Sequence, residues 1–267
     1  MREGDLILKS NNRLLVCITL SFAGIVMLGS CAQLPTDQSY ASSSTQTFSF
    51  RINTSMPEYR CIATFSETEH RQTKQIAIRD TDTGALVQTI VPPDNEVFTK
   101  SAIYFKDVTF SGDLALVIPL ERSAHAVTFA AYVWDAGQKQ FVEVPSFQNI
   151  RNPAIDPDTA RILSHNSAGQ ITSYTIYAFD GQQFAPTNSL TWQPADIESD
   201  PISNAENLVH VVERKGTETV QDFLVPSEGS YDIDQNDLRI KPYYVSGSFW
   251  DLNSSKWQST FSNEVKY

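Results

Sequence analysis

The sequence predicts an all-β protein made of antiparallel sheets. From residue 47 onward the chain is a succession of short runs rich in β-branched and aromatic residues. No long stretch repeats apolar residues at the spacing of an α-helix, and turns containing Asp and Gly separate the runs. The prediction therefore depends on the length of the runs, their residue types and the chemistry of the turns.

Three hairpins are the clearest units of the predicted fold. Their turns begin at Asp80, Asp135 and Asp180. A turn that begins with Asp therefore recurs after 55 and then after 45 residues. In each turn we expect the aspartate to accept local backbone hydrogen bonds and a glycine to supply a positive φ. The paired runs are 74–79 with 85–91, 126–134 with 140–144, and 173–179 with 183–185.

Two further hairpins are predicted closer to the C-terminus. One pairs residues 208–213 with 219–225, and the other lies within 249–257. Units repeated in this way are typical of the blades of a β-propeller, where a single sheet cannot bury its own apolar face and stacks on its neighbours. We therefore expect one irregular β-propeller-like domain over residues 47–267, with a two-sheet β-sandwich as the alternative.

Residues 1–30 are predicted to be a lipoprotein signal peptide. A leader with basic residues precedes an uncharged apolar run at 14–28, which is shorter than the roughly 20 residues that span a bilayer. The run ends at Leu28-Gly29-Ser30-Cys31, which resembles the bacterial lipobox. Cys31 is therefore the predicted lipid attachment site, and a retained apolar anchor is the alternative.

Residues 31–46 are predicted to be a flexible tether. They are rich in Ser, Thr and Gln and show no hydrophobic period, which gives a reach of about 20 Å. Ala32 follows the cysteine where, in the pattern of Gram-negative lipoproteins, Asp would retain the protein in the inner membrane. This resemblance implies a position on the periplasmic side of the outer membrane, held by the lipid anchor.

The charge balance excludes one class of partner. The 267 residues include 20 Lys and Arg against 31 Asp and Glu, which gives a formal net charge of -11. Binding to phosphates needs clustered basic side chains, and the sequence has no such cluster, so nucleic acid is not an expected partner. The hydrophobic share of 41% is also too high for a disordered chain.

The sequence predicts no catalytic residues and no enzyme. It contains no nucleophile elbow, zinc-protease pair or P-loop, and its histidines are scattered singly, at His70, His125, His165 and His210. A hydrolase whose catalytic groups meet only in space is the alternative. Cys61 is expected to be a buried strand residue; a reactive thiol, or a disulfide with Cys31 if that residue is not lipidated, are the alternatives.

Two segments, 106–114 and 232–238, resemble calcium loops. In the first, Asp107, Thr109 and Ser111 alternate before Gly112, but only Asp107 among these three is a carboxylate. In the second, Asp237 replaces the turn glycine. We expect both to be turns ordered by side-chain hydrogen bonds, so no cofactor is predicted and calcium near Asp107 is the alternative.

Aromatic side chains are the remaining candidates for binding. They can stack on sugars or anchor a protein partner, although core packing is the expected role of most of them. The pairs Tyr243-Tyr244 and Phe249-Trp250 lie near the polar C-terminal end and are predicted to form an exposed patch. The tryptophans are Trp134, Trp192, Trp250 and Trp257.

Five segments in order resemble a family of periplasmic β-propeller-like lipoproteins. Its best-known members are immunity proteins that inhibit lysozyme-like, peptidoglycan-degrading effectors of bacterial-killing type IV secretion systems. The family's calcium loop has the pattern Asp-x-Asn-x-Asp-Gly, of which this chain keeps Asp107 and Gly112 and replaces the middle ligands by Thr109 and Ser111. The segments are 76–90, 107–112, 132–141, 152–162 and 174–181.

The resemblance implies a protein that binds and blocks a peptidoglycan hydrolase, as an immunity protein or a lysozyme inhibitor. The acidic charge agrees with this, because many cell-wall hydrolases are basic and complementary charge speeds association. The alternative is a structural or glycan-binding envelope lipoprotein without inhibitory activity.

Overall fold

The computed structural model describes residues 45–66, 73–93, 103–123, 126–195, 208–227, 233–257 and 260–261. All of them belong to one compact unit, Ser42–Tyr267. The predicted signal peptide, Cys31, His70 and His125 lie outside the described residues. The first strand begins at Thr45, two residues before the domain start predicted at residue 47.

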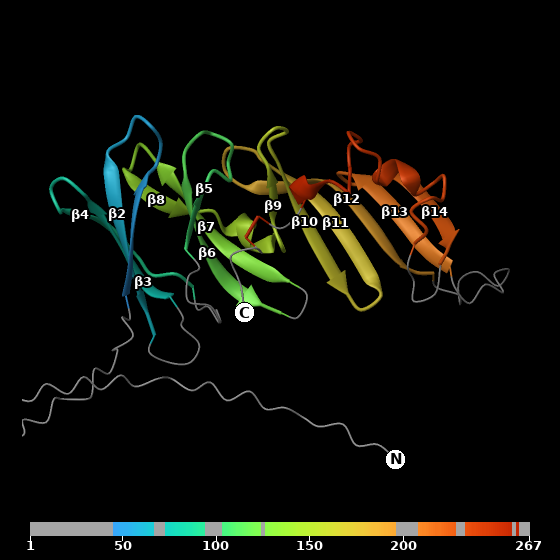
Figure 1. The fold of residues 1–267 in the computed structure, drawn as a ribbon, viewed down its shortest axis with the longest axis horizontal. Helices are drawn as coiled ribbons and strands as arrows, with labels where there is room; N and C mark the ends of the chain where they lie inside the picture. The colour runs from blue at the N-terminus through green and yellow to red at the C-terminus, as the bar shows by residue number, and fades with distance from the viewer. Residues whose placement is uncertain are drawn as a thin grey trace, which may run out of the picture. The chain divides into compact units, whose positions relative to one another are not determined.

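The prediction of an all-β fold is confirmed. The described residues contain three antiparallel sheets, none closed into a barrel, and short 3-10 helices but no α-helix (Figure 1). None of their helices is long and apolar enough to cross a membrane. The first sheet comprises β1 (Thr45–Arg51), β2 (Glu58–Phe65), β3 (Thr73–Asp80) and β4 (Leu86–Ile90).

The second and third sheets follow the first in chain order. Every hydrogen-bonded neighbour within a sheet is also a neighbour in the sequence, so each sheet is a simple meander. The second sheet comprises β5 (Tyr104–Lys106), β6 (Ala115–Arg122), β7 (Val127–Asp135) and β8 (Gln140–Glu143). The third comprises β9 (Ala154–Asp156), β10 (Arg161–Ala168), β11 (Ile171–Phe179), β12 (Phe184–Pro194), β13 (Leu208–Lys215) and β14 (Glu218–Pro226).

The aspartates at the three predicted turns act as expected. Asp80 Oδ1 accepts the backbone N–H of Thr83 at 2.7 Å, and Asp180 Oδ1 accepts that of Gln183 at 2.8 Å. Asp135 Oδ1 accepts the N–H of Gly137 at 2.8 Å. These local bonds fix the turns β3–β4, β7–β8 and β11–β12 without help from distant residues, which is why the sequence alone predicts them.

One detail of the middle turn was predicted wrongly. Gly84 and Gly181 take positive φ values of 70° and 102°, but in the β7–β8 turn the residue with positive φ is Lys139, at 54°. Gly137 instead lies close to Asp135, where an added Cβ would stand 3.2 Å from the carboxylate. The glycine therefore leaves room for the aspartate cap.

The fourth predicted hairpin is confirmed as β13–β14, and the fifth is wrong. Residues 249–257 form turns and the 3-10 helix η4 (Ser255–Trp257) in place of two strands. Asp251 has a φ of 42°, which interrupts an extended run, and the Trp257 indole donates to the Trp250 carbonyl at 2.6 Å. Turns and backbone hydrogen bonds within the segment, such as those from Ser254 to Asp251 and from Trp257 to Ser254, take the place of a strand ladder.

The described residues form three apolar clusters, and two of them join neighbouring sheets. The first joins the first and second sheets and contains Phe50, Ile78 and Ile118. The second joins the second and third sheets and contains Phe129 and Ile162. Each of these two clusters contains residues from two sheets, which agrees with the expectation that a sheet buries its apolar face against a neighbouring sheet.

An amide side chain also links the first two sheets. Gln88 on β4 accepts the backbone N–H of Phe141 on β8 at 2.7 Å and donates to the carbonyl of the same residue at 2.8 Å. Cys61 is fully buried in the cluster between these sheets and forms no disulfide. This confirms the expected buried strand cysteine; burial raises the pKa of its thiol to about 12.

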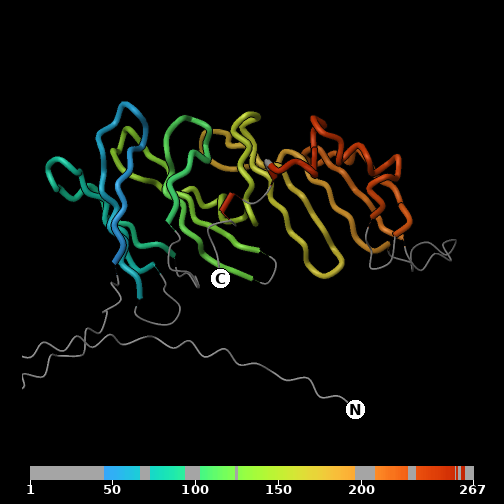
Figure 2. Tube along the Cα trace, in the orientation of Figure 1, coloured from blue at the N-terminus to red at the C-terminus, as the bar shows by residue number. Residues whose placement is uncertain are grey.

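The third cluster lies on the outer face of the six-stranded sheet. There Leu163, Val211 and Trp192 pack against Ile240 and Trp250 from the chain after β14. Residues 233–257, called the C-terminal segment below, thus cover part of this face (Figure 2). Neighbouring residues of β10 point to opposite sides, because Ile162 belongs to the second cluster and Leu163 to the third.

Candidate functional site

Two hollows lie between the six-stranded sheet and the C-terminal segment. The first, called the aromatic groove, has a volume of about 550 Å³ and lies over β13 and β14. The second, called the polar pocket, has a volume of about 400 Å³ and lies over β10, β11 and β12. Tyr243 lines the groove and its neighbour Tyr244 lines the pocket, so one stretch of the segment borders both.

The aromatic groove is built around the carboxylate of Glu213. Along β13 the residues Val209, Val211 and Glu213 alternate onto the face that carries the third cluster. Glu213 accepts the indole N–H of Trp250 at 2.8 Å and the hydroxyl of Tyr243 at 3.0 Å. Both donors come from the C-terminal segment, so these bonds fix the wall of the groove.

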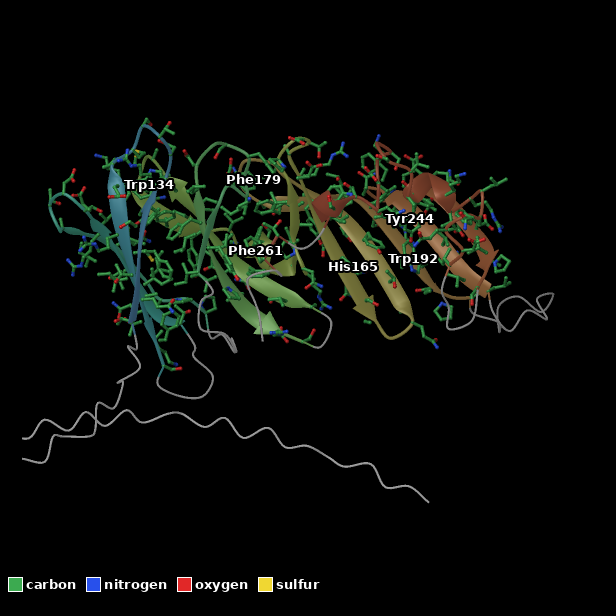
Figure 3. All side chains as sticks on the ribbon, in the orientation of Figure 1. Trp134, His165, Phe179, Trp192, Tyr244 and Phe261 are labelled. Carbon is green, nitrogen blue, oxygen red and sulfur yellow. The ribbon has the colours of Figure 1, made fainter. Side chains whose placement is uncertain are left out.

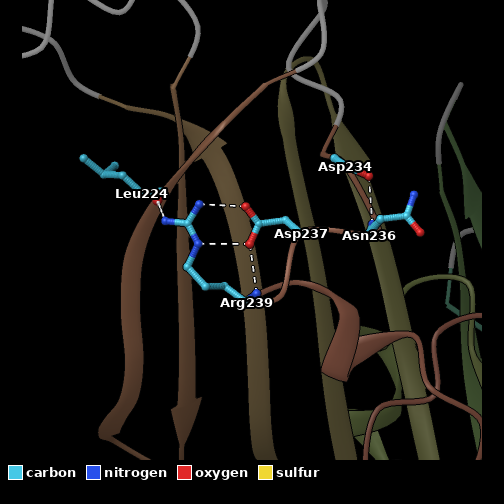
Figure 4. A network of polar contacts seen from close by, with 5 residues as sticks. All are labelled: Leu224, Asp234, Asn236, Asp237 and Arg239. Carbon is cyan, nitrogen blue, oxygen red and sulfur yellow. Dashed lines mark hydrogen bonds and ion pairs between the residues drawn. The ribbon is translucent and has the colours of Figure 1, made fainter.

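A second polar contact orders the opposite rim of the groove. The guanidinium of Arg239 donates to Asp237 at 2.7 Å and 3.0 Å and to the carbonyl of Leu224 at 2.7 Å (Figure 4). The hydrogen bonds from Arg239 hold the pKa of the Asp237 carboxyl at about 2. The arginine thereby ties the segment to β14, and Asp237 remains ionised at neutral pH.

Large apolar side chains are exposed at the mouth of the groove. Leu238 is 85% exposed and Phe249 is 42% exposed, and both line the groove. Arg161 lies over the ring of Phe249, with its guanidinium carbon 4.5 Å from the ring centre. Aromatic and arginine side chains are enriched at protein-binding surfaces, and the groove presents both beside exposed Leu238.

The histidines that the structure describes do not meet. His165 lies on β10 and stacks on Tyr174, with ring centres 4.6 Å apart. His210 lies on β13 and is 2.6 Å from Asp222 of β14. Burial lowers the pKa of His165, which keeps its ring neutral at pH 7.

The first calcium-like loop is ordered by its own hydrogen bonds. Asp107 Oδ2 accepts the backbone N–H of Gly112 at 2.8 Å, and Thr109 and Ser111 share a bond of 3.0 Å. Asp113 Oδ1 accepts the amide of Asn53 at 2.6 Å. Asp107 Oδ1 is buried and has no hydrogen-bond partner within the described chain. The hydroxyl groups of Thr109 and Ser111 are bonded to each other, so Asp107 supplies the one charged group among the three alternating positions of the loop.

The second calcium-like loop is an ordered turn as well. Asp234 accepts the backbone N–H of Asn236 at 2.8 Å, and Asp237 is bound to Arg239. Across the parts of the chain that are described, no three His, Cys, Asp or Glu side chains lie together in an arrangement that could hold a metal.

One of the four residues of the predicted exposed aromatic patch is exposed, and Tyr244 is half-buried. Phe249 is exposed, but Trp250 and Tyr243 are buried because both turn inward to Glu213. Trp192 and Trp257 are buried in the third cluster, as expected for core residues, and Trp134 packs partly buried against the first cluster. Figure 3 shows Trp134 at the left, near the first sheet, and Trp192 to the right, on the six-stranded sheet.

Sequence reasoning missed most of the groove, including four of its lining residues. Glu213 could have been found from the sequence. Val209 and Val211 alternate along the strand, which predicts that residue 213 lies on the same apolar face. A carboxylate at such a position needs buried donors, and the tryptophans and tyrosines near the C-terminus can supply them. No local pattern marks the other three, which are Phe223, Leu238 and Arg239.

Comparisons with known proteins give a distant structural likeness. No family model matches the chain, and no curated protein matches it. A solved structure described as "Structure of a Xanthomonas Type IV Secretion System related protein" is similar with a TM-score of 0.43 and 13% identity, covering 66% of this chain and 92% of that chain. The chain is thus a distant structural neighbour of a protein related to type IV secretion.

Proposed function

We propose that this protein is a lipoprotein, anchored on the periplasmic side of the outer membrane, that binds and inhibits a peptidoglycan hydrolase and is not itself an enzyme. The observation that supports this most directly is the aromatic groove with Leu238 and Phe249 exposed at its mouth. Exposed apolar side chains that lie together and are rimmed by polar residues mark protein interaction sites, and Leu238 and Phe249 line the same groove.

The composition of the groove suits a protein partner. Binding energy at protein interfaces is concentrated in a few aromatic and arginine residues that surround a hydrophobic centre. Phe223, Phe249 and Arg239 are such residues, and Leu238 stands among them. Their positions are held by the bonds of Glu213 and Asp237, so little conformational freedom is lost on binding.

Charge and position favour a hydrolase of the cell wall as the partner. The chain carries a net charge of -11, which accelerates its encounter with a basic protein. The predicted lipid on Cys31 and the tether after it would place the groove in the periplasm, where peptidoglycan hydrolases act. An inhibitor needs no turnover of its own, in agreement with the scattered histidines.

The test is capture followed by an activity assay. The full chain, tagged at its C-terminus, is incubated with a periplasmic extract and with the products of neighbouring genes, and each captured hydrolase is assayed on purified peptidoglycan. We expect one hydrolase to bind stoichiometrically and to lose its lytic activity. Failure of every captured or neighbouring hydrolase to lose activity would contradict the proposal.

Two leucine variants test the groove itself. Leu238→Asp places a charge at the centre of the exposed apolar surface and should weaken binding of the hydrolase by at least about tenfold. Leu86→Asp is the matched control, because Leu86 is 53% exposed on β4 and does not line the groove. An equal loss of hydrolase affinity in both variants would show that the groove is not the contact surface.

A further inference from the structure

The polar pocket is separate from the aromatic groove and has its own architecture. Three strands present side chains onto one face of the sheet in register: His165 lies opposite Tyr174, and Thr172 lies opposite both Ser167 and Trp192. Cross-strand neighbours of this kind stand about 5 Å apart, so the five side chains form one continuous surface. Ile233, Gln235 and Tyr244 of the C-terminal segment complete the pocket.

Aromatic rings form the apolar part of this surface. The rings of His165 and Tyr174 are stacked 4.6 Å apart and tilted by only 8°. Tyr174 and Trp192 lie 5.1 Å apart at an angle of 51°. His165, Trp192 and Tyr244 are labelled in Figure 3, where they gather over the six-stranded sheet. The pocket thus offers ring faces at more than one angle.

Several polar side chains of the pocket form no hydrogen bond to another described residue. Within the part of the chain that the structure describes, the side chains of Ser167, Gln170, Thr172 and Gln235 bond to no other group, although all four line the pocket. Two hydroxyls and two amides are therefore available, and each can both donate and accept. Such a set suits a ligand that carries several hydroxyl or amide groups.

The ten residues that the structure describes as lining the pocket carry no formal charge, because none of them is Asp, Glu, Lys or Arg. Burial lowers the pKa of His165, so the ring stays neutral at pH 7, and burial raises the pKa of Tyr174 and Tyr244, so both hydroxyls keep their protons. An ionic ligand would find no counter-charge here and would lose its hydration without compensation.

We propose that the polar pocket binds an uncharged sugar ring, a pyranose unit of a neutral glycan. A pyranose has an apolar face of C–H groups, which packs on aromatic rings, and a rim of hydroxyls, which bond to amides and hydroxyls of the protein. The volume of about 400 Å³ lies within the range of small-molecule sites. The proposal does not depend on the aromatic groove or on binding of a hydrolase.

The test follows the indole signal of Trp192 while sugar is added. The full chain, in a detergent without a sugar headgroup, is titrated with N-acetylchitotetraose and, separately, with cellotetraose. The ¹⁵N–¹H indole peak of Trp192 is assigned with Trp192→Phe. We expect this peak to shift and saturate with one of the two sugars, while the peak of Trp134, which lies outside the pocket, stays in place.

Paired glutamine variants separate binding from folding. Gln170→Ala combined with Gln235→Ala should weaken sugar binding by at least about tenfold, because both exposed amides line the pocket. Gln182→Ala combined with Gln193→Ala removes two exposed amides elsewhere and should leave binding unchanged.

Three results would overturn the proposal. One is the absence of a saturable Trp192 shift with either sugar up to about 10 mM. Another is an equal loss of affinity in both glutamine pairs. The third is a response to a tetrasaccharide of uronic acids, or to a peptide, without a response to either neutral sugar.

Discussion

Trp250 donates its indole N–H to the carboxylate of Glu213 at 2.8 Å, across 37 residues of sequence. This bond joins the C-terminal segment to the six-stranded sheet, since Trp250 follows the last strand and Glu213 lies on β13. Tyr243 adds a second bond to the same carboxylate at 3.0 Å. One acidic residue therefore satisfies two buried aromatic donors and holds the wall of the aromatic groove.

Removal of this carboxylate should destabilise the protein. Glu213→Ala leaves the indole of Trp250 and the hydroxyl of Tyr243 buried without an acceptor, which costs about 2 to 4 kcal/mol of unfolding free energy. Glu213→Gln keeps one acceptor oxygen and should cost about half as much. Urea unfolding measures the free energy of unfolding of both variants. The control is Glu218→Ala at the exposed start of β14, whose unfolding free energy should change by less than about 0.5 kcal/mol. If Glu213→Ala had the same unfolding free energy as the wild type, Glu213 would not stabilise the fold.

The Asp237 carboxyl should titrate far below an ordinary aspartate. Its pKa is about 2, because Arg239 donates side-chain and backbone hydrogen bonds to the ionised form. An unfolded aspartate has a pKa of about 3.9, so the stabilising contribution of this pair is complete above about pH 4 and is lost as the pH falls through 2. NMR titration of the side-chain carboxyl measures the midpoint directly.

The variant Arg239→Ala tests the cause of that low pKa. Without the guanidinium, the Asp237 midpoint should rise towards about 4. Asp135 serves as an internal control, because backbone hydrogen bonds from Gln138 and Gly137 lower its pKa and do not involve Arg239. An unchanged Asp237 midpoint, or an equal rise at Asp135, would show that Arg239 is not responsible.

Hairpins were predictable because their signals are local. At Asp80, Asp135 and Asp180 one side chain bonds to backbone groups two or three residues away, so a short stretch of sequence contains the whole cause. The alternation of apolar residues then places each strand in its sheet. The all-β class and the three predicted hairpins with an aspartate turn followed from these two features.

The C-terminal segment was not predictable in the same way. Its aromatic residues are of types that are common in strands. Their polar atoms, however, bond to residues far away in the sequence, as the indole of Trp250 does to Glu213. The positive φ of Asp251 is supported by a carboxylate bond to the N–H of Gly247 at 3.0 Å, which no pattern of hydrophobicity shows. The groove and the pocket both depend on this segment, so the sequence alone indicated neither.

The thiol of Cys61 should be inert in the folded protein. It is fully buried between Phe48 and Ile78 on the neighbouring strands, and burial raises its pKa to about 12. In a variant with Cys17→Ser and Cys31→Ser, Cys61 is the remaining cysteine of the three. Iodoacetamide should label it more than about 100-fold more slowly in native buffer than in denaturant, because only the exposed thiolate reacts. Equal rates would mean that the first cluster opens readily.

The anchor itself is tested by substitution of the predicted lipid site. Each buried methylene of an acyl chain contributes about 0.8 kcal/mol, so two or three chains hold a protein firmly in a membrane. Cys31→Ser should therefore block acylation and move the protein out of the detergent phase on phase separation. Cys17→Ser lies in the same leader and should leave acylation and partitioning unchanged.

Mass spectrometry of the mature N-terminus provides the second readout for this substitution. The wild-type chain should begin at Cys31 with added acyl mass, whereas Cys31→Ser should retain residues 1–30 without it. The apolar run at 14–28 is short of the roughly 20 residues of a stable span, so the uncleaved chain should associate with the membrane only weakly. If Cys31→Ser still partitions fully into detergent, the apolar run is the anchor and the lipid assignment is wrong.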